Sequence, residues 1–74
     1  MVRAMTFAEK NKDFVIRNLV GNERSKSKLM ERGFCIGEKL CVLTDQDCNL
    51  VVKVNESKYV LNISLASKIL VEEA

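Results

Sequence analysis

Histidine and proline are both absent from the sequence, and the aromatic side chains are limited to three phenylalanines and one tyrosine. Without histidine, the serine hydroxyls and the cysteine thiols lack the base that usually activates such groups as nucleophiles. Without proline, the turns of the chain must depend on glycine, asparagine, aspartate and serine. These absences predict a protein with no catalytic residues, which is therefore not an enzyme.

Long hydrophobic runs are also missing from the sequence. Its apolar stretches extend for only a few residues, whereas a bilayer-spanning helix needs about 20. The first residues, Met1 to Thr6, lack the apolar core of a secretory signal. We therefore expect a cytoplasmic protein that meets a membrane only through a partner.

A strong excess of charge of either sign is lacking as well. The chain has 12 lysines and arginines against 10 aspartates and glutamates, which gives a net charge of +2. Nucleic-acid binders usually carry a strongly basic surface, and small barrels that bind single strands also stack bases on aromatic side chains. A nucleic-acid partner is therefore not expected, although a small nucleic-acid-binding barrel is retained as an alternative function.

The three cysteines, Cys35, Cys41 and Cys48, do not form a recognisable framework. Their number is odd and no CxxC spacing occurs, which argues against disulfides and fits a reducing cytosol. Structural zinc sites use about four ligands in closely spaced pairs, and this chain offers no such pairs. We interpret the cysteines as packing residues, with Cys41 inside a strand and Cys48 exposed in a loop, and we predict neither a metal site nor a cofactor.

The length of 74 residues is enough for one domain, 1–74, whose folded core we place at about residues 6–71. The apolar fraction of 47% is ordinary for a folded domain. Domains this small bury little surface and are often stabilised by self-association. A homo-oligomer is therefore one of the partners that we consider.

The pattern of β-branched and apolar residues predicts a mostly β fold. Strands are expected at residues 14–20, 40–44, 50–54, 58–63 and 69–71. One full helix is expected at residues 22–32, with Asn22 as its N-cap and Gly33 ending it. Thr6 and Glu9 have the spacing of a capping box that starts one helical turn, and Ser64 is a candidate cap for another. Residues 45–49 and 55–57 are expected to be turns. The sequence thus predicts an all-β fold with one short helix, as a small bent barrel of about five strands.

Four side chains are candidates for contact with a partner protein. Arg24, Lys28 and Arg32 recur at helical spacing, so they form a cationic stripe that either faces solvent or docks an acidic surface. Tyr59 either presents an amphipathic ring to a partner or packs across a strand edge. Gly33 and Gly37 are interpreted as structural turn positions that need positive φ, with no ligand involved.

Residues 29–40, LMERGFCIGEKL, resemble the signature of the FeoA family: a leucine, an apolar residue and a polar pair, then Gly-Leu-x-Pro-Gly and the start of a strand. The end of the chain resembles the close of the family in its Val60-Leu61, Ala66, Ile69 and Val71. The opening resembles its first strand in Phe7 and residues 14–17. Three positions depart from the family pattern: Ile36 replaces the usual proline, Phe34 replaces leucine, and Lys12-Asp13 stands where a glycine is usual.

The resemblance to the FeoA family implies an SH3-like β-barrel. It also implies a cytoplasmic accessory of ferrous iron uptake that acts by protein–protein contact with a membrane iron permease, whose cytoplasmic part carries a G-protein domain. A related module forms the C-terminal domain of some metal-dependent repressors, which makes a self-associating regulatory module a further alternative. In this interpretation Arg24, Lys28, Arg32 and Tyr59 are the candidate contact residues.

Overall fold

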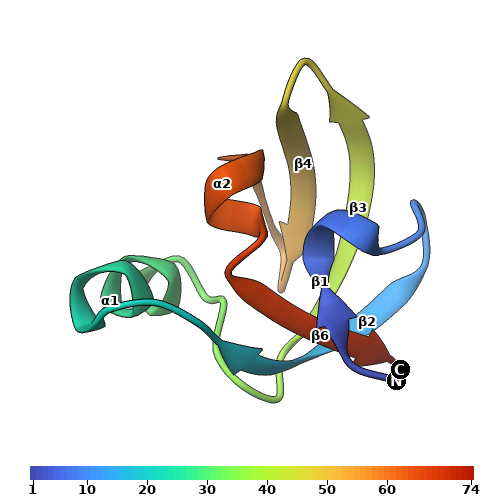
Figure 1. Ribbon diagram of the computed structural model, residues 1–74. Coiled ribbons are helices and arrows are strands. Elements are labelled where there is room, and N and C mark those ends of the chain that lie inside the picture. Colours follow the sequence, from blue (N-terminus) through green and yellow to red (C-terminus); the bar gives the residue numbers. More distant parts are fainter.

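A computed structural model describes residues 1–74 and shows a single antiparallel sheet of six strands (Figure 1). The strands are β1 (Arg3–Ala4), β2 (Asp13–Leu19), β3 (Lys39–Gln46), β4 (Asn49–Val54), β5 (Ser57–Asn62) and β6 (Ile69–Glu73). The helices are α1 (Glu23–Glu31), α2 (Ile63–Ala66) and a 3-10 turn, η1 (Met5–Phe7).

The order of the strands in the sheet is β1-β6-β2-β3-β4-β5. Since β1 pairs with β6, the two chain termini lie next to each other, as Figure 1 shows. No pairing joins β1 to β5, so the strongly bent sheet has the form of a small barrel that is not closed. The mostly β fold with one full helix is confirmed. The sixth strand, β1, was missed because two residues are too few to show alternation.

The core consists of 15 buried side chains, none of which is polar. In β4 the alternation is regular, since Leu50, Val52 and Val54 are buried while Lys53 faces solvent. Successive side chains of a strand point to opposite faces, so one face of the sheet faces the core and the other faces water. The predicted strands are confirmed, with ends that differ by one or two residues.

Helix α1 begins and ends at the residues that the sequence predicts. The Asn22 Oδ1 atom accepts a hydrogen bond from the Ser25 backbone N–H at 2.9 Å. Gly33 follows the helix with φ of 98°, and the Phe34 N–H donates to the Leu29 carbonyl at 3.0 Å. This pairing, together with the burial of both Leu29 and Phe34, forms a Schellman motif. Gly33 therefore has the predicted turn role.

Two of the predicted helix starts are wrong. At the N-terminus, no side chain caps η1, whose preceding residue is Ala4 instead of Thr6. Burial of Met5 at 0% exposure places the start of this turn two residues earlier than the capping pattern indicates. In α2 the cap is Asn62, whose Oδ1 accepts from the Leu65 N–H at 2.8 Å. Asn62 takes this position instead of Ser64 because β5 ends one residue earlier than predicted.

The hairpin between β3 and β4 is tighter than the expected loop of residues 45–49. Its turn contains only Asp47 and Cys48, with φ of 53° and 63°. Two successive residues with positive φ are the pattern of the turns that best fit the twist of a hairpin. Cys48 is exposed there and Cys41 is half-buried in β3, as predicted for both.

Candidate partner-binding site

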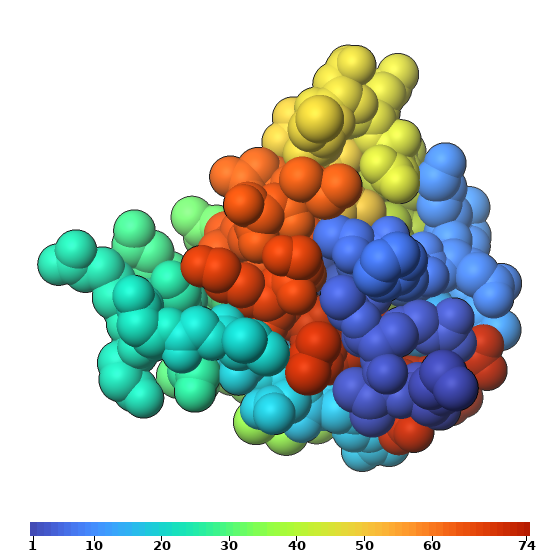
Figure 2. Space-filling view, viewed as in Figure 1, coloured from blue at the N-terminus to red at the C-terminus, as the bar shows by residue number.

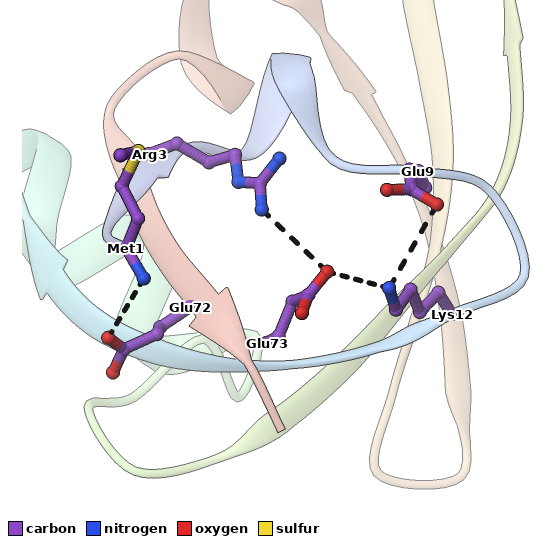
Figure 3. Close-up of polar contacts among 6 residues, drawn as sticks. All are labelled: Met1, Arg3, Glu9, Lys12, Glu72 and Glu73. Atoms are coloured by element: carbon purple, nitrogen blue, oxygen red, sulfur yellow. Dashed lines mark hydrogen bonds and ion pairs between the residues drawn. The ribbon is translucent and has the colours of Figure 1, made fainter.

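Glu72 and Glu73, in the C-terminal strand β6, take part in four of the five ion pairs of the molecule, and these pairs lie around the chain termini. Glu72 accepts from Arg17 Nε at 2.8 Å and from the N-terminal ammonium of Met1 at 3.3 Å. Figure 3 shows the pairs that connect Glu73 with Arg3 and Lys12. The distance from Lys12 Nζ to the Glu73 carboxylate is 2.6 Å. These contacts fasten the two ends of the chain to each other at the surface.

The ion pairs change the pKa values of the groups involved. The hydrogen bond from Arg17, followed by that from the N-terminus, lowers the pKa of Glu72 below its ordinary value of 4.5. The hydrogen bond from Lys12 lowers the pKa of Glu73 in the same way, and that bond raises the pKa of Lys12 above 10.5. The carboxylates therefore stabilise the fold above their ordinary pKa, and this contribution is lost as pH falls through their lowered folded values.

We expect the double variant Glu72→Gln, Glu73→Gln to have a lower unfolding temperature than the wild type at about pH 7, with the difference shrinking as pH falls below about 4. In acid the wild-type carboxylates are themselves protonated and lose their pairs. Thermal unfolding followed by circular dichroism at several pH values measures this difference. Glu56→Gln, at an exposed position outside the ion pairs, is the matched control, and a difference independent of pH would contradict the prediction.

The region around α1 and α2 carries cations without such partners. None of the ion pairs within 4.0 Å includes Arg24, Lys28, Arg32 or Lys68. In Figure 1, α1 extends away from the sheet on the side of α2. The paired charges thus lie around the chain termini, whereas these four cations around α1 and α2 belong to no ion pair.

Lys28 and Arg32 line a cleft of about 310 Å³ between α1 and α2, and Lys68 lines it from the opposite side. Figure 2 shows the surfaces of the two helices next to each other on one face of the molecule. Lys68 is brought there because the Val20 N–H, just before α1, donates to the Lys68 carbonyl at 2.8 Å. Lys68 was not among the predicted residues, since it follows Arg32 by more than thirty positions and belongs to no helical stripe with it.

The other predicted contact residues have different surroundings. Arg24 is exposed near the start of α1 and does not line the cleft. Tyr59 lies in the edge strand β5, half-buried, with its ring centroid 5.6 Å from that of Phe34. The structure therefore brings Lys28 and Arg32 together with Lys68, and leaves Arg24 and Tyr59 outside this cleft.

Gly37 has φ of 95°, as its predicted structural role requires. It borders a second groove, of about 440 Å³, beside the start of β3. This groove is lined by charges of both signs, including Asp13, Glu38, Lys39 and Lys53. Because these charges offset one another, the second groove does not select for ligands of one sign.

Among the cysteines and carboxylates of the chain, no group of three or more lies close enough together to hold a metal ion. None of the helices has both the length and the apolar character needed to cross a membrane.

A family model, described as the FeoA domain, matches residues 3–73. The chain belongs to the FeoA family. The predicted family membership is thereby confirmed. The family is associated with ferrous iron transport. A comparison with curated proteins finds no significant match.

Solved structures with the same fold include other FeoA proteins. An iron uptake regulatory protein (FeoA) matches with a TM-score of 0.91 and 19% identity, over 100% of this chain and 99% of that one. FeoA from Stenotrophomonas maltophilia, described as an SH3 domain protein and solved with zinc, matches with a TM-score of 0.77 and 23% identity, over 97% and 89% of the two chains. The predicted SH3-like fold is thereby confirmed for this FeoA chain.

The fold also occurs within a larger regulator. A manganese-dependent transcriptional repressor matches with a TM-score of 0.88 and 13% identity, over 99% of this FeoA chain but 42% of the repressor. At this identity the likeness concerns the fold alone.

Proposed function

We propose that this FeoA-family protein is a cytoplasmic, non-catalytic accessory of ferrous iron uptake. In this proposal its single domain acts by contact with the cytoplasmic G-protein domain of the membrane iron permease. The observation that carries the proposal is the match to the FeoA domain over residues 3–73. A role as a ferrous iron transport activating factor has been put forward for the Stenotrophomonas maltophilia protein of the same fold.

The unpaired cations at the α1–α2 end support a docking role for this part of the surface. Lys28, in α1, and Arg32, its C-cap residue, have no carboxylate within 4.0 Å, so both side chains are available to pair with an acidic partner surface. Arg24 extends the same stripe toward the start of α1. Tyr59 lies at the open edge of the sheet, where the exposed part of its ring is available to a partner.

The proposed mechanism requires a difference in affinity. A protein that binds one nucleotide state of the G-protein domain more tightly than the other shifts the equilibrium toward the state that it prefers. Such an effect needs no catalytic group and no metal in the accessory protein itself. The contact surface alone determines the strength and the direction of the effect.

We expect a clean deletion of the gene to lower the rate of ferrous iron uptake by cells. The wild-type gene and the variant Lys53→Glu, which changes an exposed lysine on β4, should both restore uptake. The double variant Lys28→Glu, Arg32→Glu should fail to restore it although the protein accumulates to the same level. Uptake of radioactive ferrous iron measures the effect, and unchanged uptake after deletion would contradict the proposed function.

A second candidate function is a self-associating regulatory module. It is favoured by the fold shared with the manganese-dependent repressor and by β5, which pairs with β4 on one side and with no strand on the other. An open edge strand is able to pair with a second copy of the chain. Sedimentation at increasing protein concentration distinguishes a homo-oligomer from a monomer, and salt-dependent binding of an oligonucleotide would instead support the nucleic-acid alternative.

A further inference from the structure

The cleft between α1 and α2 presents hydrogen-bond donors and positive charge together. Lys28 and Arg32 line one side, and Lys68 lines the other. Ser25 of α1 and Ser64 of α2 also line this space. No aspartate or glutamate is among the lining residues. A cleft with three cations and no acid selects for groups that carry negatively charged oxygen atoms.

The backbone amides around the cleft are largely occupied, which bears on the kind of anion. The Ser25 N–H is bonded to the Asn22 side chain, and the Leu65 N–H to the Asn62 side chain. The Ile63 N–H donates to the Cys48 carbonyl at 2.9 Å. Compact phosphate sites usually surround the anion with free backbone N–H groups. Here the donors that remain are mainly side chains, and they are spread along the cleft.

The spacing of the cations fits an extended peptide. Lys28 and Arg32 are four residues apart, so they are separated by about 6 Å along the helix axis. In an extended chain, side chains at alternate positions lie on one face and are separated by about 6.6 Å. Two carboxylates at alternate positions of an extended segment therefore match Lys28 and Arg32, and Lys68 adds a third positive charge to the lining of the cleft.

We propose that the α1–α2 cleft binds an extended acidic segment of the partner protein, in which carboxylates alternate with other residues. This inference rests on the proposed function, because it specifies the part of the partner that the accessory protein recognises. Leu65, half-buried in the wall of the cleft, provides an apolar contact for the side chain between two carboxylates.

Lys68 holds a defined position in this site. Its side chain is half-buried, and its Cδ atom lies 3.5 Å from where a Cβ atom at Gly21 would stand. The methylene stem therefore packs beside Gly21, just before α1, and Lys68 lines the cleft from this position. A lysine whose stem is packed loses less conformational freedom on binding than one that extends freely into solvent.

The site can be tested with a blocked peptide in which glutamate alternates with alanine, titrated into the isotope-labelled protein and followed by NMR. We expect the amide signals of Ser25, Ser64 and Lys68 to shift, and the affinity to fall as salt concentration rises. The double variant Lys28→Glu, Arg32→Glu should bind at least about tenfold more weakly. Lys68→Met, which removes the charge but keeps a stem of nearly the same length, should weaken binding about threefold.

Lys53→Glu is the control, because it makes one charge reversal of the same kind at an exposed position on β4, away from the cleft. Its affinity should stay within about twofold of the wild type. Equal weakening by Lys53→Glu and the cleft variants, or shifts that map elsewhere, would overturn the inference. A glutamine-for-glutamate peptide should not bind. Binding of inorganic pyrophosphate in the cleft without binding of the acidic peptide would also overturn it, in favour of a phosphate ligand.

The same measurements separate the inference from the proposed function. If the G-protein domain of the permease binds but the acidic peptide neither binds nor competes, the cleft is not the recognition site and the proposed function stands. If the peptide binds in the cleft but the G-protein domain does not bind, the acidic-segment site stands and its partner is a different protein.

Discussion

Replacing Phe14 with alanine is expected to remove a large part of the protein's free energy of unfolding, whereas the same substitution at Phe7 leaves this free energy nearly unchanged. Phe14 is fully buried near the start of β2, and the Arg3 guanidinium carbon lies 5.8 Å from the centre of its ring. Truncation of a buried phenylalanine to alanine costs about 3–5 kcal/mol. A domain of 74 residues has only about 4–11 kcal/mol of stability at the typical value per residue.

Urea unfolding at equilibrium, followed by circular dichroism, measures the free energy of unfolding of both variants. Phe7 is 74% exposed, so Phe7→Ala should change this free energy by less than about 0.5 kcal/mol. Equal losses in the two variants would mean that Phe14 does not belong to the core described above.

The substitution of Gly33 by alanine is expected to destabilise the fold more than the substitution of Gly37. Both glycines have positive φ, 98° and 95°, outside the region that alanine adopts easily, and such strain costs about 1–3 kcal/mol. At Gly33 a Cβ atom would also stand 3.1 Å from Asn55 Nδ2, whereas at Gly37 it would have no neighbour within 4 Å.

Unfolding free energies of Gly33→Ala and Gly37→Ala, determined side by side, separate backbone strain from steric contact. The loss common to both variants reports the strain. The additional loss in Gly33→Ala reports the displacement of Asn55 and the weakening of the Schellman motif that ends α1. A smaller loss in Gly33→Ala than in Gly37→Ala would show that the helix end is more adaptable than its hydrogen bonds indicate.

The features that were predictable from the sequence are those governed by local chemistry. Asn22 caps α1 because its short side chain reaches the free amides of the first turn. Gly33 ends α1 because only glycine adopts its φ at little cost. The alternation of buried and exposed side chains defines strands such as β4. Each of these signals is contained within a few neighbouring residues.

The features that were not predictable depend on contacts between distant segments. Thr6 and Glu9 do not cap η1, although their spacing is that of a capping box. Met5 is buried in the core instead, and η1 starts at this residue. Strand β1 exists because Arg3 and Ala4 pair with β6, at the other end of the chain. No local pattern indicates either result, since both require the sheet to be assembled first.

The candidate binding site likewise combines a part that local sequence predicts with a part that depends on contacts between distant segments. The helical spacing of Lys28 and Arg32 was visible in the sequence, and both side chains line the cleft. Lys68 completes the site only because the backbone bond from Val20 holds the segment after α2 beside the start of α1. The contact roles of all four predicted residues remain predictions, and Arg24 and Tyr59 lie outside this cleft.

The most direct test of the proposed role is a calorimetric titration of the purified protein with the soluble cytoplasmic G-protein domain of the host's ferrous iron permease, with and without guanine nucleotide. The proposal predicts saturable binding that depends on the nucleotide and is weakened by the double variant Lys28→Glu, Arg32→Glu. The absence of binding in every nucleotide state would contradict contact with this domain.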